Sequence, residues 1–228
     1  TLADLARRGI EHAAIEASSH GLAQYRLDGL ALAAAAFTNL TRDHLDYHAD
    51  VADYFAAKSR LFDSLLPAGA TSVLNADVPE FATLSAIAKR RGIHVLDYGK
   101  SANALRLERI EPEAQGLRLA IAHDGRRHET LIPLAGAFQA MNALAALGLA
   151  LATGSAFAPA FAALSRLSGV RGRMELVARH ANGAPIYVDY AHTPDALETV
   201  LAALRPHVEG RLVALFGAGG DRDPGKRP

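Results

Sequence analysis

Three side chains capable of metal or amine chemistry lie within the first 60 residues: Glu16, His44 and Lys58. The lysine is the unusual member, because it falls on a stripe of apolar residues with the three- and four-residue spacing of a buried helix face. The positions on this stripe are Val51, Phe55, Lys58, Phe62 and Leu65. Desolvation there would favour the neutral amine and so lower the pKa of Lys58. Alternatively, the stem of the lysine lies along the apolar face and its charge reaches water.

A neutral lysine amine can take up CO₂ to form a carbamate, which offers two oxygen ligands and a negative charge. Glu16 follows a short apolar run at 13–15, and a second run at 33–37 precedes His44. Both runs are predicted strands, and ligands of parallel sheets bind beyond the carboxyl ends of the strands. A carboxylate and a histidine at that edge could hold Mg²⁺, which prefers oxygen and shares its shell with substrate phosphates. Alternatively, both side chains serve only as helix caps or loop contacts.

A second polar group follows a predicted strand at 186–188, in the order Asp189-Tyr-Ala-His192-Thr-Pro. An acid at the end of a strand can accept hydrogen bonds from a ribose, as in dinucleotide-binding folds. Thr193 is also a suitable helix cap, with Pro194 at the first helical position. The cap accounts for Thr193 and Pro194, and it leaves Asp189 and His192 as candidates for binding.

A glycine-rich basic segment at 217–227 could cradle an anion with its backbone amides. It is not a phosphate loop of the Walker type, since Gly225-Lys226 is followed by Arg227. Six further histidines have no partner pattern and are expected at the surface. They are His12, His94, His123, His128, His180 and His207.

Short apolar runs alternate with helical patterns over residues 1–100, which predicts an α/β fold with a mostly parallel sheet and flanking helices. In addition to the runs described above, strands are predicted at 71–74 and 93–96, with helices at 51–65 and 79–90. Alternating residues then predict a small antiparallel sheet at 104–133.

The dipeptide Asp124-Gly125 is a strong hairpin signal within that antiparallel sheet. A helix is predicted at 138–153, and Gly154 is a usual left-handed cap for its end. A second unit opens near Gly172 with the strand at 186–188, a helix at 194–204 and a strand at 211–216. We therefore expect two domains, at 1–170 and 171–228.

The bulk composition is that of a globular protein, with 228 residues of which 50% are hydrophobic and 21% charged. Lys+Arg and Asp+Glu both number 24, so the net charge does not indicate a nucleic-acid or membrane partner. The absence of cysteine excludes disulfides and thiolate metal sites. No apolar run approaches the roughly 20 residues of a membrane span, and the N-terminus does not resemble a signal peptide. We expect a cytoplasmic monomer that is an internal piece of a longer protein.

Six stretches, in this order, resemble the Mur ligases, the ATP-dependent amide synthetases of peptidoglycan assembly. They are Glu16-Ala-Ser-Ser-His-Gly-Leu, Phe37-Thr-Asn-Leu-Thr-Arg-Asp-His-Leu-Asp-Tyr-His48, Tyr54-Phe-Ala-Ala-Lys58, Gly172-Arg-Met-Glu175, Asp189-Tyr-Ala-His-Thr-Pro-Asp195 and Gly219-Gly-Asp-Arg-Asp-Pro-Gly-Lys-Arg-Pro228. Together they span nearly the whole chain and are far more specific than any one alone. The resemblance is strongest to the member that adds the third residue of the stem peptide.

The resemblance implies roles for residues of each group. The metal site is formed by Glu16, His44 and a carbamylated Lys58, of which His44 and Lys58 are catalytic. The positions that hold a UDP-muramoyl-dipeptide are Ser18, Gln24 and Arg26, and Arg222 meets the incoming diamino acid. The nucleotide-binding positions are Asn142, Arg173 and Asp189, with His192 close by. At position 139 the family usually has an asparagine, and Gln139 keeps the amide on a longer side chain.

The resemblance also implies that ATP and Mg²⁺ activate the glutamyl carboxylate of the dipeptide as an acyl phosphate, which the amine of diaminopimelate attacks. The implied fold is a Mur ligase central domain followed by the start of a Rossmann-like C-terminal domain. The family's phosphate loop and its diaminopimelate-specificity motif do not occur in these residues, so the chain alone is expected to be inactive. Alternatives are a lysine-adding homologue, a folylpolyglutamate synthetase-like ligase and a non-catalytic nucleotide- or substrate-binding module.

Overall fold

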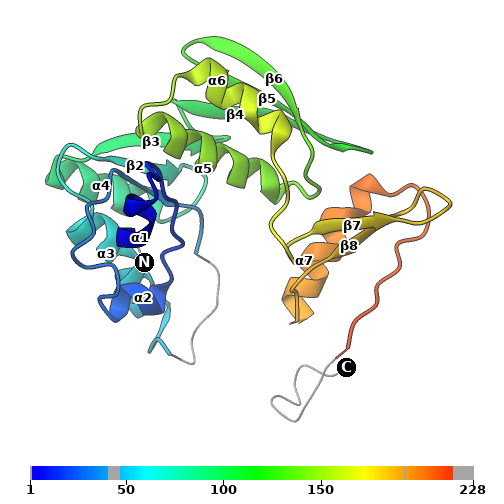
Figure 1. The fold of residues 1–228 in the computed structure, drawn as a ribbon, viewed down its shortest axis with the longest axis horizontal. Helices are drawn as coiled ribbons and strands as arrows, with labels where there is room; N and C mark the ends of the chain where they lie inside the picture. Colours follow the sequence, from blue (N-terminus) through cyan, green and yellow to red (C-terminus); the bar gives the residue numbers. More distant parts are fainter. Residues whose placement is uncertain (1, 41–46, 193, 218–228) are drawn as a thin grey trace.

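The computed structural model describes residues 2–40, 47–192 and 194–217, and Figure 1 shows how their elements are arranged. A six-stranded sheet forms the larger unit, with its strands in chain order. They are β1 (Ala34–Phe37), β2 (Thr71–Asn75), β3 (His94–Gly99), β4 (Leu105–Glu113), β5 (Gly116–His123) and β6 (Arg126–Ile132). The strands β1 to β4 are parallel, whereas β4, β5 and β6 pair antiparallel. A second, two-stranded antiparallel sheet consists of β7 (Glu175–Arg179) and β8 (Pro185–Val188).

The α-helices of the described residues are α1 (Leu2–Arg7), α2 (Ser19–Ala23), α3 (Val51–Arg60), α4 (Phe81–Arg91), α5 (Phe138–Ala152), α6 (Phe157–Ala163) and α7 (Pro194–Leu204). A π-helical turn at Leu61–Leu65 extends α3. Short 3-10 turns follow α6 and α7, at Leu164–Arg166 and Arg205–His207. Within these described segments, no helix has the length and apolar content to cross a membrane.

Helices cover both faces of the parallel strands. Val73 and Leu74 are neighbours in β2 and point to opposite faces, because side chains alternate along a strand. Val73 packs with α5 in the larger core, whereas Leu74 packs with the π-helical turn and α4 in a second core. The inward residues of the antiparallel strands, such as Leu119 and Ile132, join the larger core. The predicted α/β class with flanking helices is therefore confirmed.

The predicted antiparallel strands form, and they continue the parallel sheet because the last residues of β3 pair with the first residues of β4. The hairpin between β5 and β6 turns at Asp124 and Gly125, whose φ angles are 49° and 71°. These two residue types tolerate the left-handed backbone that a tight hairpin requires. The helix α5 ends as predicted, with Gly154 at a φ of 97°.

Two predicted strands are not strands among the described residues: 13–15 and 211–216 are irregular and largely exposed. A strand needs a neighbour that satisfies its backbone hydrogen bonds. β1 pairs with β2 on one side, and on its other side no strand of the described residues pairs with it, so 13–15 does not join the sheet. In the second run, Leu215 is fully exposed. The prediction of strands at 13–15 and 211–216 from their apolar content is therefore wrong.

A small apolar contact and a histidine join the two units. The contact consists of Ala135, Met174 and Leu204. His207 accepts a hydrogen bond from the Gly136 N–H through Nε2 at 3.2 Å, and its Nδ1 lies 3.0 Å from the Glu113 carbonyl oxygen. The prediction that His207 is an unpartnered surface residue is wrong. The same correction applies to His123 and His128, whose rings pack on Phe157.

Candidate functional site

The residues from Ser18 to Arg26 form a tight turn around the short helix α2. We call it the substrate turn because it carries the predicted dipeptide-binding residues Ser18, Gln24 and Arg26. Ser18 caps the helix by accepting a hydrogen bond from the Gly21 N–H at 3.1 Å. A β-carbon at Gly21 would lie 3.1 Å from Ser18 Oγ and 3.9 Å from Arg26 Cδ, so the turn packs closely around this glycine. The Arg26 guanidinium donates to Gln24 Oε1 at 2.5 Å. The structure thus brings Ser18, Gln24 and Arg26 together, and all three are exposed.

Arg60 of α3 fixes the substrate turn in place. Its guanidinium donates to the Leu22 carbonyl oxygen at 2.8 Å and to Asp28 Oδ2 at 2.6 Å. The same group lies 4.1 Å from the centroid of the Tyr25 ring. The hydrogen bond to Asp28 raises the pKa of Arg60, so the guanidinium stays charged. Since α3 also carries Lys58, the substrate turn and the lysine share one support.

Lys58 is half-buried, and its Nζ lies 5.2 Å from the centroid of the Tyr54 ring. Tyr54 is 5% exposed and takes the inward position one helical turn before the lysine. The predicted apolar stripe faces inward in its second half, where Phe62 is 1% exposed. Its first residue, Val51, is 48% exposed because the helix begins at the surface. The amine is thus placed at the boundary between the core and solvent.

Glu16 is exposed and lies two residues before the cap of α2. His44 and Arg222 lie outside the described residues. Within the described ranges, no group of three histidine, aspartate or glutamate side chains converges on a possible metal position. A cation shared by Glu16, His44 and Lys58 therefore stays a prediction.

His48 is a buried histidine beside this site to which the sequence analysis assigned no role. It is 3% exposed, and its Nδ1 lies 3.2 Å from Asp53 Oδ2. Asp50 caps α3 by accepting a hydrogen bond from the Asp53 N–H at 2.8 Å. The pattern Asp50-x-x-Asp53, two residues after the histidine, is a helix-start signal that could have marked this place in the chain.

Asn142, a predicted nucleotide-binding residue, lies in the N-terminal half of α5. Its Nδ2 donates to Gln139 Oε1 at 3.1 Å, so the two amides lie on one face of the helix. The segment just before this helix contacts the second unit, where a β-carbon on Gly136 would lie 3.2 Å from Ala203 Cβ. The Gln139–Asn142 pair therefore lies near the junction of the two units.

Asp189, at the end of β8, organises the other predicted nucleotide residues. Its two carboxylate oxygens accept hydrogen bonds from the Met174 N–H at 2.8 Å and the Ala191 N–H at 2.7 Å. The Arg173 guanidinium lies 5.2 Å from the Tyr190 ring centroid, and the His192 ring lies 4.9 Å from it. The structure thus brings Arg173, Asp189 and His192 together around Tyr190.

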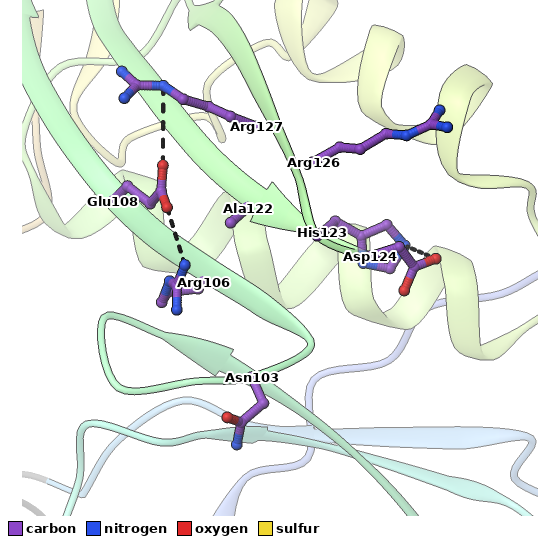
Figure 2. Close-up of a pocket in the computed structure, with 9 residues that line it drawn as sticks. Asn103, Arg106, Glu108, Ala122, His123, Asp124, Arg126 and Arg127 are labelled. Carbon is purple, nitrogen blue, oxygen red and sulfur yellow. Dashed lines mark hydrogen bonds and ion pairs between the residues drawn. The ribbon is translucent and has the colours of Figure 1, made fainter.

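A pocket of about 340 Å³ lies on the antiparallel strands β4 to β6, and it contains none of the predicted site residues. Figure 2 shows Arg106 and Arg127 on either side of Glu108 in this pocket. The carboxylate pairs with both guanidinium groups, at 3.1 Å and 3.9 Å. The single carboxylate offsets only one of these two positive charges, but because the pocket contains none of the predicted site residues we do not place the functional site here.

Two family models match the chain: the Mur ligase middle domain over residues 1–150, and the Mur ligase, glutamate ligase domain over residues 172–228. A curated relative from Mesorhizobium japonicum, named UDP-N-acetylmuramoyl-L-alanyl-D-glutamate--2,6-diaminopimelate ligase, is 52% identical over 227 residues. The match covers 100% of this chain and 47% of the relative. The chain therefore spans about half the length of the curated relatives that it matches.

A solved structure of a UDP-N-acetylmuramoyl-L-alanyl-D-glutamate--2,6-diaminopimelate ligase is 35% identical, with a TM-score of 0.81. It covers 99% of this chain, which corresponds to 46% of that chain. The apo form of L. casei FPGS is 18% identical, with a TM-score of 0.65 over 80% of this chain and 44% of that chain, and this likeness concerns the fold alone. The shared fold, the two matching domains and the identity over the whole length lead to one conclusion: this chain belongs to the Mur ligase family.

Proposed function

We propose that this chain is part of a ligase that uses ATP to join 2,6-diaminopimelate to UDP-N-acetylmuramoyl-L-alanyl-D-glutamate. The relative from Mesorhizobium japonicum carries the name of that activity and supports the proposal. The structural observation that carries it is the clamp by which Arg60 holds the substrate turn on the helix of Lys58. In this proposal residues 1–170 form the central domain, and residues 171–228 begin the C-terminal domain.

The proposed reaction must bring a substrate carboxylate close to a polyphosphate. Each pair of like charges 4 Å apart repels by about 1 kcal/mol in water and about 4 kcal/mol at an effective dielectric constant of 20. Arg26 suits the carboxylate, because a planar guanidinium bonds it through two N–H groups. The partner of Arg26 on the substrate turn is the neutral amide oxygen of Gln24, which does not neutralise the charge. Ser18 and Gln24 supply further polar contacts to the dipeptide.

Mg²⁺ is proposed to bind to Glu16, His44 and a carbamate on Lys58. This donor set fits the ion, because carboxylate and carbamate oxygens are the kind of ligand that magnesium prefers. The half-buried position of Lys58 fits as well, since a partly desolvated amine is reachable by CO₂. The bound cation would offset the charge of the phosphoryl group and polarise its oxygens. The contact with the Tyr54 ring restricts the directions in which Lys58 can extend.

The nucleotide is proposed to bind at the junction of the two units, near Asn142, Arg173, Asp189 and His192. Amides such as Asn142 and Gln139 offer a donor and an acceptor to the edge of a base. Asp189 retains lone pairs beyond its two backbone hydrogen bonds and can accept from a ribose. Arg222 is proposed to bind a carboxylate of the diamino acid. We propose a cytoplasmic monomer that acts without nucleic acid or membrane.

The test replaces Lys58 with alanine in the complete open reading frame that encodes this chain. We expect ligation to be lost, and a small carboxylate added to the buffer should restore part of it by supplying the missing oxygen ligands. The matched control is Lys89→Ala, which removes an exposed lysine near the end of α4 and should leave the rate unchanged. Full activity of Lys58→Ala without any additive would remove the lysine from the mechanism.

A second measurement concerns the 228-residue chain by itself. We expect it neither to hydrolyse ATP nor to form the amide, because no Walker-type phosphate loop occurs in its sequence. Binding of the UDP-muramoyl-dipeptide to this chain, measured by calorimetry, would then show which part of the activity it carries. Turnover of ATP by the purified chain would contradict this expectation.

A further inference from the structure

His48 lies between the substrate turn and α3, and its hydrogen bond determines its tautomer. Nδ1 lies 3.2 Å from Asp53 Oδ2, which also accepts a hydrogen bond from the Ala49 N–H at 3.3 Å. An ionised carboxylate only accepts hydrogen bonds, so Nδ1 carries the proton. In the neutral ring, Nε2 then presents a lone pair.

The ring of His48 contacts both halves of the proposed site. Its centroid lies 5.0 Å from that of Tyr47, whose hydroxyl accepts a hydrogen bond from Gln24 Nε2 at 3.3 Å. On the other side, the centroid lies 5.2 Å from that of Tyr54, the ring that supports Lys58. The histidine thus packs between Tyr47, which is hydrogen-bonded to the substrate turn, and Tyr54, which contacts Lys58.

Among the described residues, the second nitrogen of His48, Nε2, is buried without a hydrogen-bond partner. A buried acceptor that lacks a donor lowers stability, whereas a phenyl ring would fill similar space without that loss. Asp53 does not need the histidine for solvation, because its side chain is 54% exposed. By comparison, His207, which lies between the two units, has both ring nitrogens in hydrogen bonds. Packing alone therefore does not explain an imidazole at position 48.

We propose that His48 is a positioning residue of the ligation site, whose Nε2 accepts a hydrogen bond from an N–H group that arrives when the site is loaded. This inference rests on the proposed function. The N–H group has two possible sources, an amide of the bound muramoyl peptide or the carbamate of Lys58. His48 contacts the Tyr47 ring, which bonds the predicted substrate residue Gln24, and the Tyr54 ring beside Lys58, and the experiment distinguishes the two sources.

The experiment compares His48→Phe with the control His128→Phe in the complete protein. His128 also packs on aromatic rings, 4.6 Å from Phe157 and 5.4 Å from Phe161, but it lies on β6, outside the proposed site. We expect His48→Phe to melt at the same or a higher temperature than the unaltered protein and to lose at least tenfold in kcat/KM. His128→Phe should change neither quantity.

Two measurements identify the source of the N–H group. If it belongs to the peptide, His48→Phe weakens binding of the UDP-muramoyl-dipeptide about tenfold in a titration without ATP. If it belongs to Lys58, that affinity is unchanged and the bicarbonate concentration for half-maximal ligation rises several-fold. A second variant, His48→Gln, places an amide oxygen near the position of Nε2 and should recover part of the activity.

The inference is overturned if His48→Phe ligates at the rate of the unaltered protein, or if activity in the Phe and Gln variants simply follows their melting temperatures. The unaltered protein is assayed first, and its failure to ligate would contradict the proposed function. The titration with the dipeptide needs no turnover, so in that case it still decides whether the peptide is the source of the N–H group. Unchanged affinity together with an equal carbamate signal of Lys58 in the unaltered protein and in His48→Phe, measured by ¹³C-bicarbonate labelling, would then overturn the inference.

Discussion

The clamp formed by Arg60 offers a direct test of how the site is supported. Replacing Arg60 with methionine keeps much of the apolar stem and removes the guanidinium, which makes two hydrogen bonds and lies over the Tyr25 ring. We expect the substrate turn to loosen while the core of the larger unit remains folded, because both hydrogen bonds of the guanidinium and its ring contact go to residues 22–28. Binding of the UDP-muramoyl-dipeptide should weaken as a consequence.

The magnitude follows from the exposure of the partners. The side chains of Arg60 and Asp28 are 20% and 41% exposed, so solvent screens their ion pair and it contributes about 0.2–1 kcal/mol. The hydrogen bond to the Leu22 carbonyl oxygen is better protected and contributes about 1–1.5 kcal/mol. The contact with the Tyr25 ring adds about 0.5–1 kcal/mol. Because these terms are not additive, we expect a loss of about 2 kcal/mol.

The assay is amide hydrogen exchange over residues 22–28, together with urea unfolding. Exchange in that segment should accelerate about thirtyfold, as about 2 kcal/mol implies, while protection in β2 and β3 stays constant. A double-mutant cycle with Asp28→Asn should give a coupling energy below about 1 kcal/mol. Arg90→Met is the control, since the pair of Arg90 with Asp63 is 64% and 48% exposed and should contribute little. Unchanged exchange over residues 22–28 in Arg60→Met would refute the reasoning.

Three further predictions concern the sheet. Gly148→Ala should destabilise by about 1 kcal/mol in urea unfolding, because its β-carbon would lie 2.6 Å from Val73 Cγ1 and overpacking outweighs the gain in helix propensity; a more stable variant would contradict this. Burial opposes ionisation of Asp77, but backbone N–H donors at the end of β3 outweigh it and lower the pKa of Asp77. The ionised carboxylate should contribute its full stabilisation above the unfolded pKa of about 3.9 and lose it as the pH falls toward the folded pKa. The difference in free energy of unfolding between the unaltered protein and Asp77→Asn should therefore shrink between about pH 6 and pH 3, and a difference independent of pH would refute this. Tyr98→Phe should cost about 1–2 kcal/mol, because the buried hydroxyl donates to the Phe37 carbonyl oxygen at 3.1 Å and phenylalanine removes that donor. An unchanged urea midpoint would argue against that bond.

The candidate site was only partly predictable from the sequence. The motif around Glu16 to Arg26 located the substrate turn, because its polar residues are close together in the chain. The sequence did not indicate that Arg60 holds this turn, since a contact across 38 residues has no local signature. The helix-start pattern at Asp50 and Asp53 marks the place of His48 in the chain, but its burial was not predictable, because that burial comes from rings contributed by two separate segments.

Local chemistry determined the elements whose signals lie within a few residues. Pro194 marks the start of α7, Gly154 follows α5, and Asp124-Gly125 forms the hairpin turn, because backbone preferences act on each residue independently of the fold. Only the tertiary structure decided that the apolar runs at 13–15 and 211–216 are not strands, since a strand exists through hydrogen bonds to a neighbour that the run does not contain. It also decided how deeply Lys58 lies, because burial depends on what the rest of the chain packs against that face.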